Sequence, residues 1–368
     1  MNGRRLIGAA FVLAALALLA APSASPQPSR PGALILDPSS GRVLARVPIN
    51  HLITSAVPDG RGGWYVGGFF TRIGGQPRRG LAHLRPDGAV DARFRVPVAS
   101  SRGNPVSVRA LARAAELLYV GCACGLVGGL HRPGLAAIDV RTGAVLESFE
   151  PGTWTDIDRL AVTGERLLVA RSCCNYPVRG IAALDLRTGA LDRDWNAGFR
   201  LVGDAGVFNA LVVHGSRVFA AGTFRLSGLP RNGLVALDAR TGAPDRRWAP
   251  KPPNCPVCIG FASLSGLAVS DERVYVSGSF SRFVGAPRNG VAALDPRTGA
   301  VDRSWRPARG GQGILTIALA GGRLYLGTTN GLLALDAETG AAVRAPKVPF
   351  REVFPLVPSG RRLLVAGR

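Results

Sequence analysis

One pattern of apolar and polar positions recurs along the chain. A continuous apolar run ends in Asp, a polar turn with a Thr-Gly pair follows, and a large aromatic residue comes six residues after that glycine. The clearest copies are GIAALDLRTGALDRDW from Gly180, GLVALDARTGAPDRRW from Gly233 and GVAALDPRTGAVDRSW from Gly290. An apolar run of this length predicts a strand buried on both faces. The Asp and the Gly predict a hairpin turn, because Asp accepts backbone N–H bonds and Gly adopts positive φ.

Weaker copies extend the pattern over most of the chain. They are GALILDPSSGRVLARV from Gly32, GLAHLRPDGAVDARF from Gly80, GLAAIDVRTGAVLESF from Gly134 and GLLALDAETGAAVRA from Gly331. The leading glycines of the seven copies lie 41 to 57 residues apart. A second repeated strand, such as RVYVSGSF from Arg273, comes before each copy, and another apolar strand lies upstream of it. Four antiparallel strands in about 50 residues form the blade of a β-propeller.

The sequence therefore predicts an all-β fold, a seven-bladed β-propeller of four-stranded antiparallel blades. The chain begins with the last two strands of a unit and ends with the first two, so the N- and C-terminal strands share one blade and close the ring. Residues 32–368 form a single propeller domain. The expected blades are 52–95, 106–149, 157–195, 208–248, 262–305, 313–346, and a split blade of 351–368 with 32–47.

The first residues have the pattern of an export signal. Arg4 and Arg5 come before an apolar segment that ends at Ala20, and the small residues Ala21-Pro22-Ser23 follow. This order predicts a signal peptide over residues 1–23, a flexible lead-in over 24–31, and a secreted or cell-surface protein. No transmembrane segment follows the predicted cleavage. An uncleaved membrane anchor is the alternative.

The stretch from Tyr65 to Phe94 carries a family resemblance. Its paired Gly67-Gly68 and Phe69-Phe70, followed by Arg79-Gly80, Asp87-Gly88 and Asp91, resemble the delta-sixty repeat of bacterial exported propellers. The Asp-x-x-Thr-Gly turns are similar to those of the quinoprotein dehydrogenase-like, YVTN-like propeller superfamily, where the tryptophan normally lies nearer the turn glycine. The resemblance implies the architecture and no particular activity.

Connections after the second and fourth strands of each unit lie on one face, the long-loop face; the opposite face, the turn face, carries short turns. All six cysteines fall on the long-loop face, and they are Cys122, Cys124, Cys173, Cys174, Cys255 and Cys258. In an exported protein an even count predicts disulfides. Cys255 and Cys258 are expected to close locally, and the other four to cross-link neighbouring loops. A metal site built from the clustered thiols is the alternative.

The charge balance is strongly basic. The chain has 45 Lys and Arg against 24 Asp and Glu, a formal net charge of +21. Arginines recur in the hairpin turns at Arg141, Arg187, Arg240 and Arg297, and other arginines open the second strands. This pattern predicts an arginine-rich turn face that attracts polyanions such as an anionic cell-surface polymer, although the chain has no specific nucleic-acid motif. The alternative is a general preference for Arg, with neighbouring Asp and Glu neutralising part of the charge.

No catalytic, cofactor-binding or metal-binding residues are predicted. The chain has no G-x-S-x-G, H-E-x-x-H, P-loop or Ca²⁺-loop pattern. Its four histidines, His51, His83, His131 and His214, lack a repeated acidic partner, and aspartates such as Asp139 recur in every turn, which indicates a structural role.

The leading functional interpretation is a monomeric, non-enzymatic binding or scaffold module that uses the long-loop face and the central funnel, with an unknown ligand. It requires no cofactor. The alternatives are an enzyme of quinoprotein-like or carbohydrate-active type with its site in the funnel, and polyanion binding by the turn face. The binding-module interpretation predicts a funnel lined by apolar, Ser, Thr and Gly side chains. The enzyme interpretation predicts a funnel with two or more convergent acids, or with an Arg/Asp/Trp set around a planar cofactor.

Overall fold

The chain was examined as a computed structural model, which describes residues 31–100, 103, 105–171, 180–195, 207–225, 232–250, 263–307 and 313–368. The predicted signal peptide, the lead-in up to residue 30, and the cysteines Cys173, Cys174, Cys255 and Cys258 lie outside the described residues. Every regular element within them is a β-strand.

The larger sheets are all antiparallel and each has three or four strands. From the centre of the ring outwards they are β3 (Ile53–Pro58), β4 (Trp64–Gly68) and β7 (Leu81–Leu84); β9 (Ser107–Ala114), β10 (Leu117–Ala123) and β13 (Leu135–Asp139); β14 (Ile157–Thr163), β15 (Arg166–Arg171) and β16 (Gly180–Asp185); β17 (Val207–His214), β18 (Arg217–Arg225) and β19 (Asn232–Asp238); β20 (Leu264–Val269), β21 (Val274–Gly278) and β24 (Val291–Leu294); β25 (Ile314–Ala320), β26 (Arg323–Thr328), β27 (Gly331–Asp336) and β28 (Ala342–Val343); and β29 (Val353–Ser359), β30 (Arg362–Gly367), β1 (Gly32–Leu36) and β2 (Val43–Pro48).

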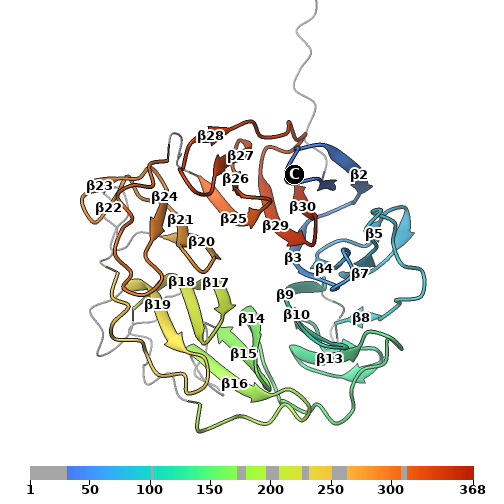
Figure 1. Cartoon of the computed structure of the whole chain (residues 1–368). Coiled ribbons are helices and arrows are strands. Elements are labelled where there is room, and N and C mark those ends of the chain that lie inside the picture. Colours follow the sequence, from blue (N-terminus) through green and yellow to red (C-terminus); the bar gives the residue numbers. More distant parts are fainter. Residues whose placement is uncertain are drawn as a thin grey trace, which may run out of the picture.

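These sheets stand around a common centre (Figure 1). Their inner strands contact one another in the closed circuit β3–β9–β14–β17–β20–β25–β29–β3. The C-terminal strand β30 pairs with β1 from the N-terminal part of the chain, from Gly32 opposite Gly367 to Leu36 opposite Leu363. The expected pairing of the two ends is therefore present, and the all-β propeller prediction is confirmed. The blade number of seven and the blade boundaries stay predictions, because part of the chain lies outside the described residues.

The fourth strand of most units is shorter than the sequence predicts. In five units it is reduced to a single bridge, such as Leu294 with Val301. In four of these units an aspartate follows the bridge. In three of the four, the aspartate Oδ1 accepts hydrogen bonds from the backbone N–H groups two and three residues further on. Asp302, for example, binds the N–H groups of Ser304 and Trp305. This turn bends the chain away from the sheet. Val343 stands at the position of this aspartate in another unit, and there the fourth strand is the longer β28. Leu146 also stands at this position, but its unit has only a single bridge.

Three connections on the long-loop face fold into small hairpins. They are β5 (Arg72–Ile73) with β6 (Gln76–Pro77), β11 (Leu126–Val127) with β12 (Leu130–His131), and β22 (Arg282–Phe283) with β23 (Ala286–Pro287); β8 (Val98–Ala99) also pairs with β11. A buried arginine anchors the first and last of them. Arg78 donates to the carbonyl of Asp91, and Arg288 donates to the carbonyl of Asp302.

The hydrophobic core is divided into clusters that lie between neighbouring sheets, and aromatic side chains hydrogen-bond across these junctions. Trp305 is fully buried, and its indole N–H donates to the carbonyl of Ala337 in the next sheet at 3.0 Å. Tyr275 donates its hydroxyl to the same carbonyl at 2.7 Å. The repeated aromatic residue therefore joins adjacent blades through both its apolar area and its polar atom.

Candidate functional site

The described residues enclose a central funnel of about 590 Å³. It is lined by the inner strands, mainly through Ala, Val, Leu and Ile side chains. The polar lining consists of Ser, Thr, Asn and Arg side chains, which are Thr54, Ser55, Arg109, Arg159, Asn209, Ser265 and Thr316. The apolar, Ser, Thr and Gly residues of the lining are those that the binding-module interpretation expects, whereas Arg109, Arg159 and Asn209 were not expected.

A β-bulge interrupts each inner strand near its first residues, and most of the bulged residues are polar. Thr54 donates its hydroxyl to the carbonyl of Val108, and Ser265 donates to that of Ile314, in each case on the next inner strand. The amide of Asn209 reaches the carbonyl of Leu264 in the same way, at 2.8 Å. Bulges re-aim side chains, and here they direct polar groups sideways along the funnel wall.

Two arginines give the funnel positive charge. Arg159 is held by the backbone, because its guanidinium donates to the carbonyls of Asn209 and Asp158 at 2.8 and 2.6 Å. Burial lowers the pKa of Arg159, although Asp158 opposes that effect. Arg109 is only half-buried and contacts Asp156 at 3.5 Å. Its guanidinium can therefore still form a bidentate pair with a carboxylate that enters the funnel.

On the turn face, the repeated aspartates have two structural roles. In every unit except the one with Arg85 at this position, the first aspartate of the turn binds following backbone N–H groups: Asp139, for example, accepts from Arg141 and Thr142. These bonds hold the pKa of Asp139 below its ordinary value. The interpretation of these residues as turn residues is confirmed.

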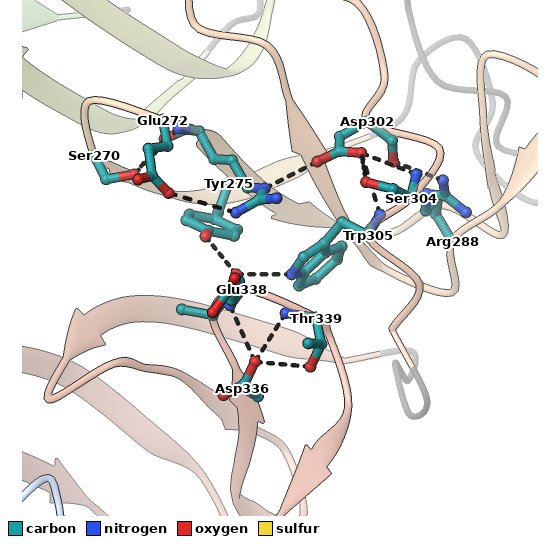
Figure 2. Close-up of polar contacts among 12 residues, drawn as sticks. Ser270, Glu272, Tyr275, Arg288, Asp302, Ser304, Trp305, Asp336, Glu338 and Thr339 are labelled. Atoms are coloured by element: carbon teal, nitrogen blue, oxygen red, sulfur yellow. Dashed lines mark hydrogen bonds and ion pairs between the residues drawn. The ribbon is translucent and has the colours of Figure 1, made fainter.

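The second aspartate pairs with the arginine that opens the second strand. Asp302 binds Arg273 Nε at 2.9 Å, next to the contacts of Tyr275 and Trp305 (Figure 2). Two other units repeat the pair, Asp192 with Arg166 at 2.6 Å and Asp245 with Arg217 at 3.0 Å. Burial alone would raise the pKa of Asp302, but hydrogen bonds from Ser304, Arg273 and the backbone N–H groups lower it to about 2.

A second cavity, the rim pocket, lies on the turn face between the β3–β4–β7 and β9–β10–β13 sheets. Its volume is about 340 Å³, and Tyr65, His83, Arg93, Arg113 and Arg141 are among the residues that line it. His83 is 14% exposed, and it lies 3.0 Å from Asp59 Oδ2 through Nε2 and 3.0 Å from Asp91 Oδ2 through Nδ1. Both ring nitrogens of His83 are therefore within hydrogen-bond distance of a carboxylate.

The carboxylates of the rim pocket are well stabilised. Burial would raise the pKa of Asp59, but hydrogen bonds from His83 and the backbone N–H groups of Arg61 and Gly63 outweigh it and lower the pKa. The pKa of Asp91 is lowered in the same way, by the N–H of Arg93 and by His83. The sequence interpretation, which found no repeated acidic partner for the histidines, missed this pair of contacts.

The family of the chain is shown by a comparison with protein-family models. The family described as outer membrane protein assembly factor BamB matches residues 131–343, which is more than half of the chain. The chain belongs to this family. A β-propeller domain of unknown function, DUF5122, also matches residues 58–94 of this BamB-family propeller. A search of the curated proteins found no match.

Solved structures agree with the fold of this BamB-family propeller. The computationally designed Ika8 protein is 14% identical with a TM-score of 0.52, over 89% of this chain and 87% of that one. The β-propeller domain of Cps50 (Swd1) from Myceliophteria thermophila is 12% identical with a TM-score of 0.54, over 87% and 98%. The extracellular domain of the putative one component system BT4673 from B. thetaiotaomicron is 15% identical with a TM-score of 0.52; the match covers 86% of this chain but only 38% of that one. At these identities the likeness shows the fold alone.

The structure pairs two of the cysteine candidates with each other. Cys122 and Cys124 are joined at the end of β10, with their Cα atoms 5.2 Å apart. This local pairing of Cys122 on β10 with Cys124 just beyond the strand differs from the expected cross-link to a neighbouring loop. The other four candidates lie outside the described residues.

The arginine-rich ring is smaller than the sequence predicts. The turn arginines Arg141, Arg187, Arg240 and Arg297 are exposed, as expected. However, Arg166, Arg217 and Arg273 are paired with aspartates and are at most about a third exposed. These three contribute little to a long-range field because each has a carboxylate in contact. The signal for these pairs is in the sequence, since each arginine accompanies an aspartate three residues before the tryptophan.

Two further observations concern only the described part of the chain. No helix there could span a membrane. No group of three or more His, Cys, Asp and Glu side chains there has an arrangement that would hold a metal ion.

Proposed function

We propose that this BamB-family propeller is an exported, monomeric scaffold that binds a partner through its funnel and long-loop face, without catalysis. The funnel carries the proposal: small polar side chains, apolar side chains and the half-buried Arg109 line a preformed cavity of about 590 Å³. A preformed cavity with few polar groups suits binding. The family description, an assembly factor, supports the same role.

Export is part of this proposal. The charged, apolar and small segments of residues 1–23 support it, and so does the family description, an outer membrane protein assembly factor. We also propose that the unit from Tyr65 to Phe94 is a delta-sixty repeat, because the match to the DUF5122 propeller domain spans the same residues.

An enzyme of quinoprotein-like or carbohydrate-active type is the competing proposal. It needs acids or a cofactor-binding set that converge on the funnel. The funnel lining combines arginine with Ser, Thr and Asn, and thus favours recognition of a partner's acceptor groups over acid–base chemistry.

The experiment compares partner recovery by the wild type and by a funnel variant, both produced with their own leader. Partners are crosslinked to the protein in the extracytoplasmic fraction and recovered with it. Arg109→Glu reverses the charge of the half-buried funnel arginine, so a partner recovered with the wild type should be lost with this variant. Arg187→Glu makes the same charge change on the turn face and should retain that partner. The mass of the recovered protein should correspond to cleavage after Ser23. Equal recovery by the two variants, or retention of the protein in the cytoplasm, would contradict the proposal.

Polyanion binding by the turn face is a second candidate function. The observation that favours it is the exposure of Arg141, Arg187, Arg240 and Arg297 at equivalent turns. Flat guanidinium groups suit phosphate and carboxylate partners.

We expect the variant with all four turn arginines changed to Gln to elute from an anionic-polymer column at lower salt than the wild type, because binding of this kind depends on the number of neutralised charges. The control changes four exposed arginines outside these turns, Arg46, Arg79, Arg95 and Arg351, to Gln. If the two variants elute together, retention reflects net charge, and the turn arginines form no binding face.

A further inference from the structure

The junction between the β20–β21–β24 and β25–β26–β27–β28 sheets shows how this fold normally fills the site of the rim pocket. Arg273 lies there and pairs with Asp302, while Tyr275 and Trp305 both donate to the carbonyl of Ala337 (Figure 2). The guanidinium and the two aromatic rings lie between the sheets, and Arg273 Nε, the Tyr275 hydroxyl and the Trp305 indole N–H each have an acceptor.

The rim pocket arises where the chain departs from this arrangement. The strand register places Gly63 at the position of Arg273 and Tyr65 at that of Tyr275. Gly63 cannot be replaced by a larger residue, because a Cβ would lie 2.3 Å from the carbonyl oxygen of Leu84 and 2.6 Å from Asp59 Oδ2. Phe94 stands at the tryptophan position and has no N–H group. The missing guanidinium and indole leave the cavity of about 340 Å³.

The acceptors that face the rim pocket already have donors. Asp59 receives hydrogen bonds from His83 and from the backbone N–H groups of Arg61 and Gly63. Asp91 receives bonds from His83 and from the N–H of Arg93. Glu116 is the third carboxylate of the lining. Because His83 and the backbone satisfy two of the three carboxylates, these two acids do not need a cationic ligand.

The donors of the rim pocket, in contrast, are in excess. Four arginines line it, namely Arg61, Arg93, Arg113 and Arg141. The strand register compares this junction with the one between the β20–β21–β24 and β25–β26–β27–β28 sheets. Arg113 takes the position of the apolar Leu319, and Arg141 takes the position of Glu338. Nε of Arg113 is buried and has no hydrogen-bond partner among the described residues. Both replacements add positive charge at this junction.

Tyr65 adds a neutral donor. Its counterparts Tyr119, Tyr275 and Tyr325 each donate to the carbonyl that follows the turn aspartate of the next unit. The described contacts contain no such bond from Tyr65 to Val140, which lines the rim pocket with it. Burial raises the pKa of Tyr65 to about 12, although Arg113 opposes that effect. The hydroxyl therefore stays protonated at neutral pH and can donate.

We infer that the rim pocket is a binding site for a small oxyanionic ligand, a molecule that carries a carboxylate or phosphate group. Arg113 and the Tyr65 hydroxyl bind its oxygen atoms, and Arg93 and Arg141 close the mouth of the pocket. Guanidinium groups match both kinds of oxyanion. The volume is at the lower end of the range for ligand pockets, so the ligand is compact. The site is separate from the funnel, and this inference does not depend on the proposed scaffold function.

The test is calorimetric titration of the folded full-length protein with inorganic phosphate and, separately, with acetate, each against sodium chloride of equal ionic strength. We expect saturable binding of at least one probe. Arg113→Gln should weaken that binding at least about 10-fold, because a charge-assisted hydrogen bond is lost. Tyr65→Phe removes only the hydroxyl and should weaken it about 3- to 10-fold. The preferred probe distinguishes a phosphate ligand from a carboxylate ligand.

Arg351→Gln is the matched control, because it removes the same charge from an exposed position outside the rim pocket and outside the four turn arginines. Its affinity should remain within about twofold of the wild type. Thermal melts must show that each variant is folded. The inference is overturned if neither probe binds above the chloride control, or if Arg113→Gln and Arg351→Gln bind as the wild type does.

Discussion

Deletion of residues 361–368 should abolish cooperative folding of the propeller. The deletion removes β30, the strand that lies between β1 and β29. Leu363, Leu364 and Val365 on this strand are fully buried, and the burial of three such side chains contributes about 5–9 kcal/mol. This is comparable with the whole stability of a typical domain. The deletion also leaves the edges of β1 and β29 unpaired and opens the ring.

Thermal unfolding monitored by circular dichroism measures this effect. Arg368→Ala is the control, since it keeps the strand and removes only an exposed ion pair with Glu352, which contributes little because solvent screens it. The truncated protein should show no unfolding transition at the temperature where the control unfolds. A truncated protein that melts cooperatively at the wild-type temperature would show that the β1–β30 ladder is not needed for closure.

The propeller could be predicted from the sequence because strand, turn and aromatic positions all repeat in the same order. A run such as Leu234 to Leu237 predicts a buried strand, and Asp238 with Gly242 predicts the turn after it. The pairing of the chain ends follows from the half-units at each end. Because the same strand and turn signals occur in several units, a weak signal in one unit does not change the predicted fold. The local preferences of the repeats also agree with the global arrangement.

The Arg–Asp pairs of the turn face were within reach of the same reasoning. The three units that open their second strand with Arg166, Arg217 and Arg273 also carry an aspartate three residues before their tryptophan. The sequence interpretation treated the two positions separately and therefore overestimated the free positive charge. Comparison of which units carry both residues would have predicted the contact.

The rim pocket, in contrast, could not be predicted from the repeat. It depends on departures from the repeated pattern, Gly63 and His83 in one unit and Arg113 in the next, and each looks like ordinary variation when read alone. Only the strand register brings them to one junction. The bulged residues of the funnel were hidden for a similar reason, since one extra residue in a strand has no sequence signature here.

The network around Asp302 predicts how stability depends on pH. The pKa of Asp302 is lowered from its ordinary value of 3.8 to about 2, so the folded state binds the proton less well than the unfolded state. A lowered carboxylate pKa contributes stability that is complete above the unfolded value and is lost as the pH falls through the folded value. The carboxylate is 21% exposed, and the shift corresponds to about 2 kcal/mol at neutral pH. Removal of the Asp302 carboxylate would also leave Arg273, which is 17% exposed, without its partner. The loss of stability expected from this unpaired charge is of similar size.

Asp302→Asn should therefore destabilise the protein by about 2 kcal/mol at pH 7, and this difference from the wild type should shrink to about half near pH 3. Urea unfolding at pH 7, 4 and 3 measures the difference directly. Asp271→Asn is the matched control: its carboxylate contacts His214 but is 97% exposed, so the change should stay within about 0.5 kcal/mol at pH 7. If the Asp302→Asn difference does not depend on pH, the ionised carboxylate is not the source of its stabilisation. If it does shrink, then the same argument extends to the other aspartates whose pKa is lowered, and the propeller as a whole should lose stability between about pH 4 and pH 2.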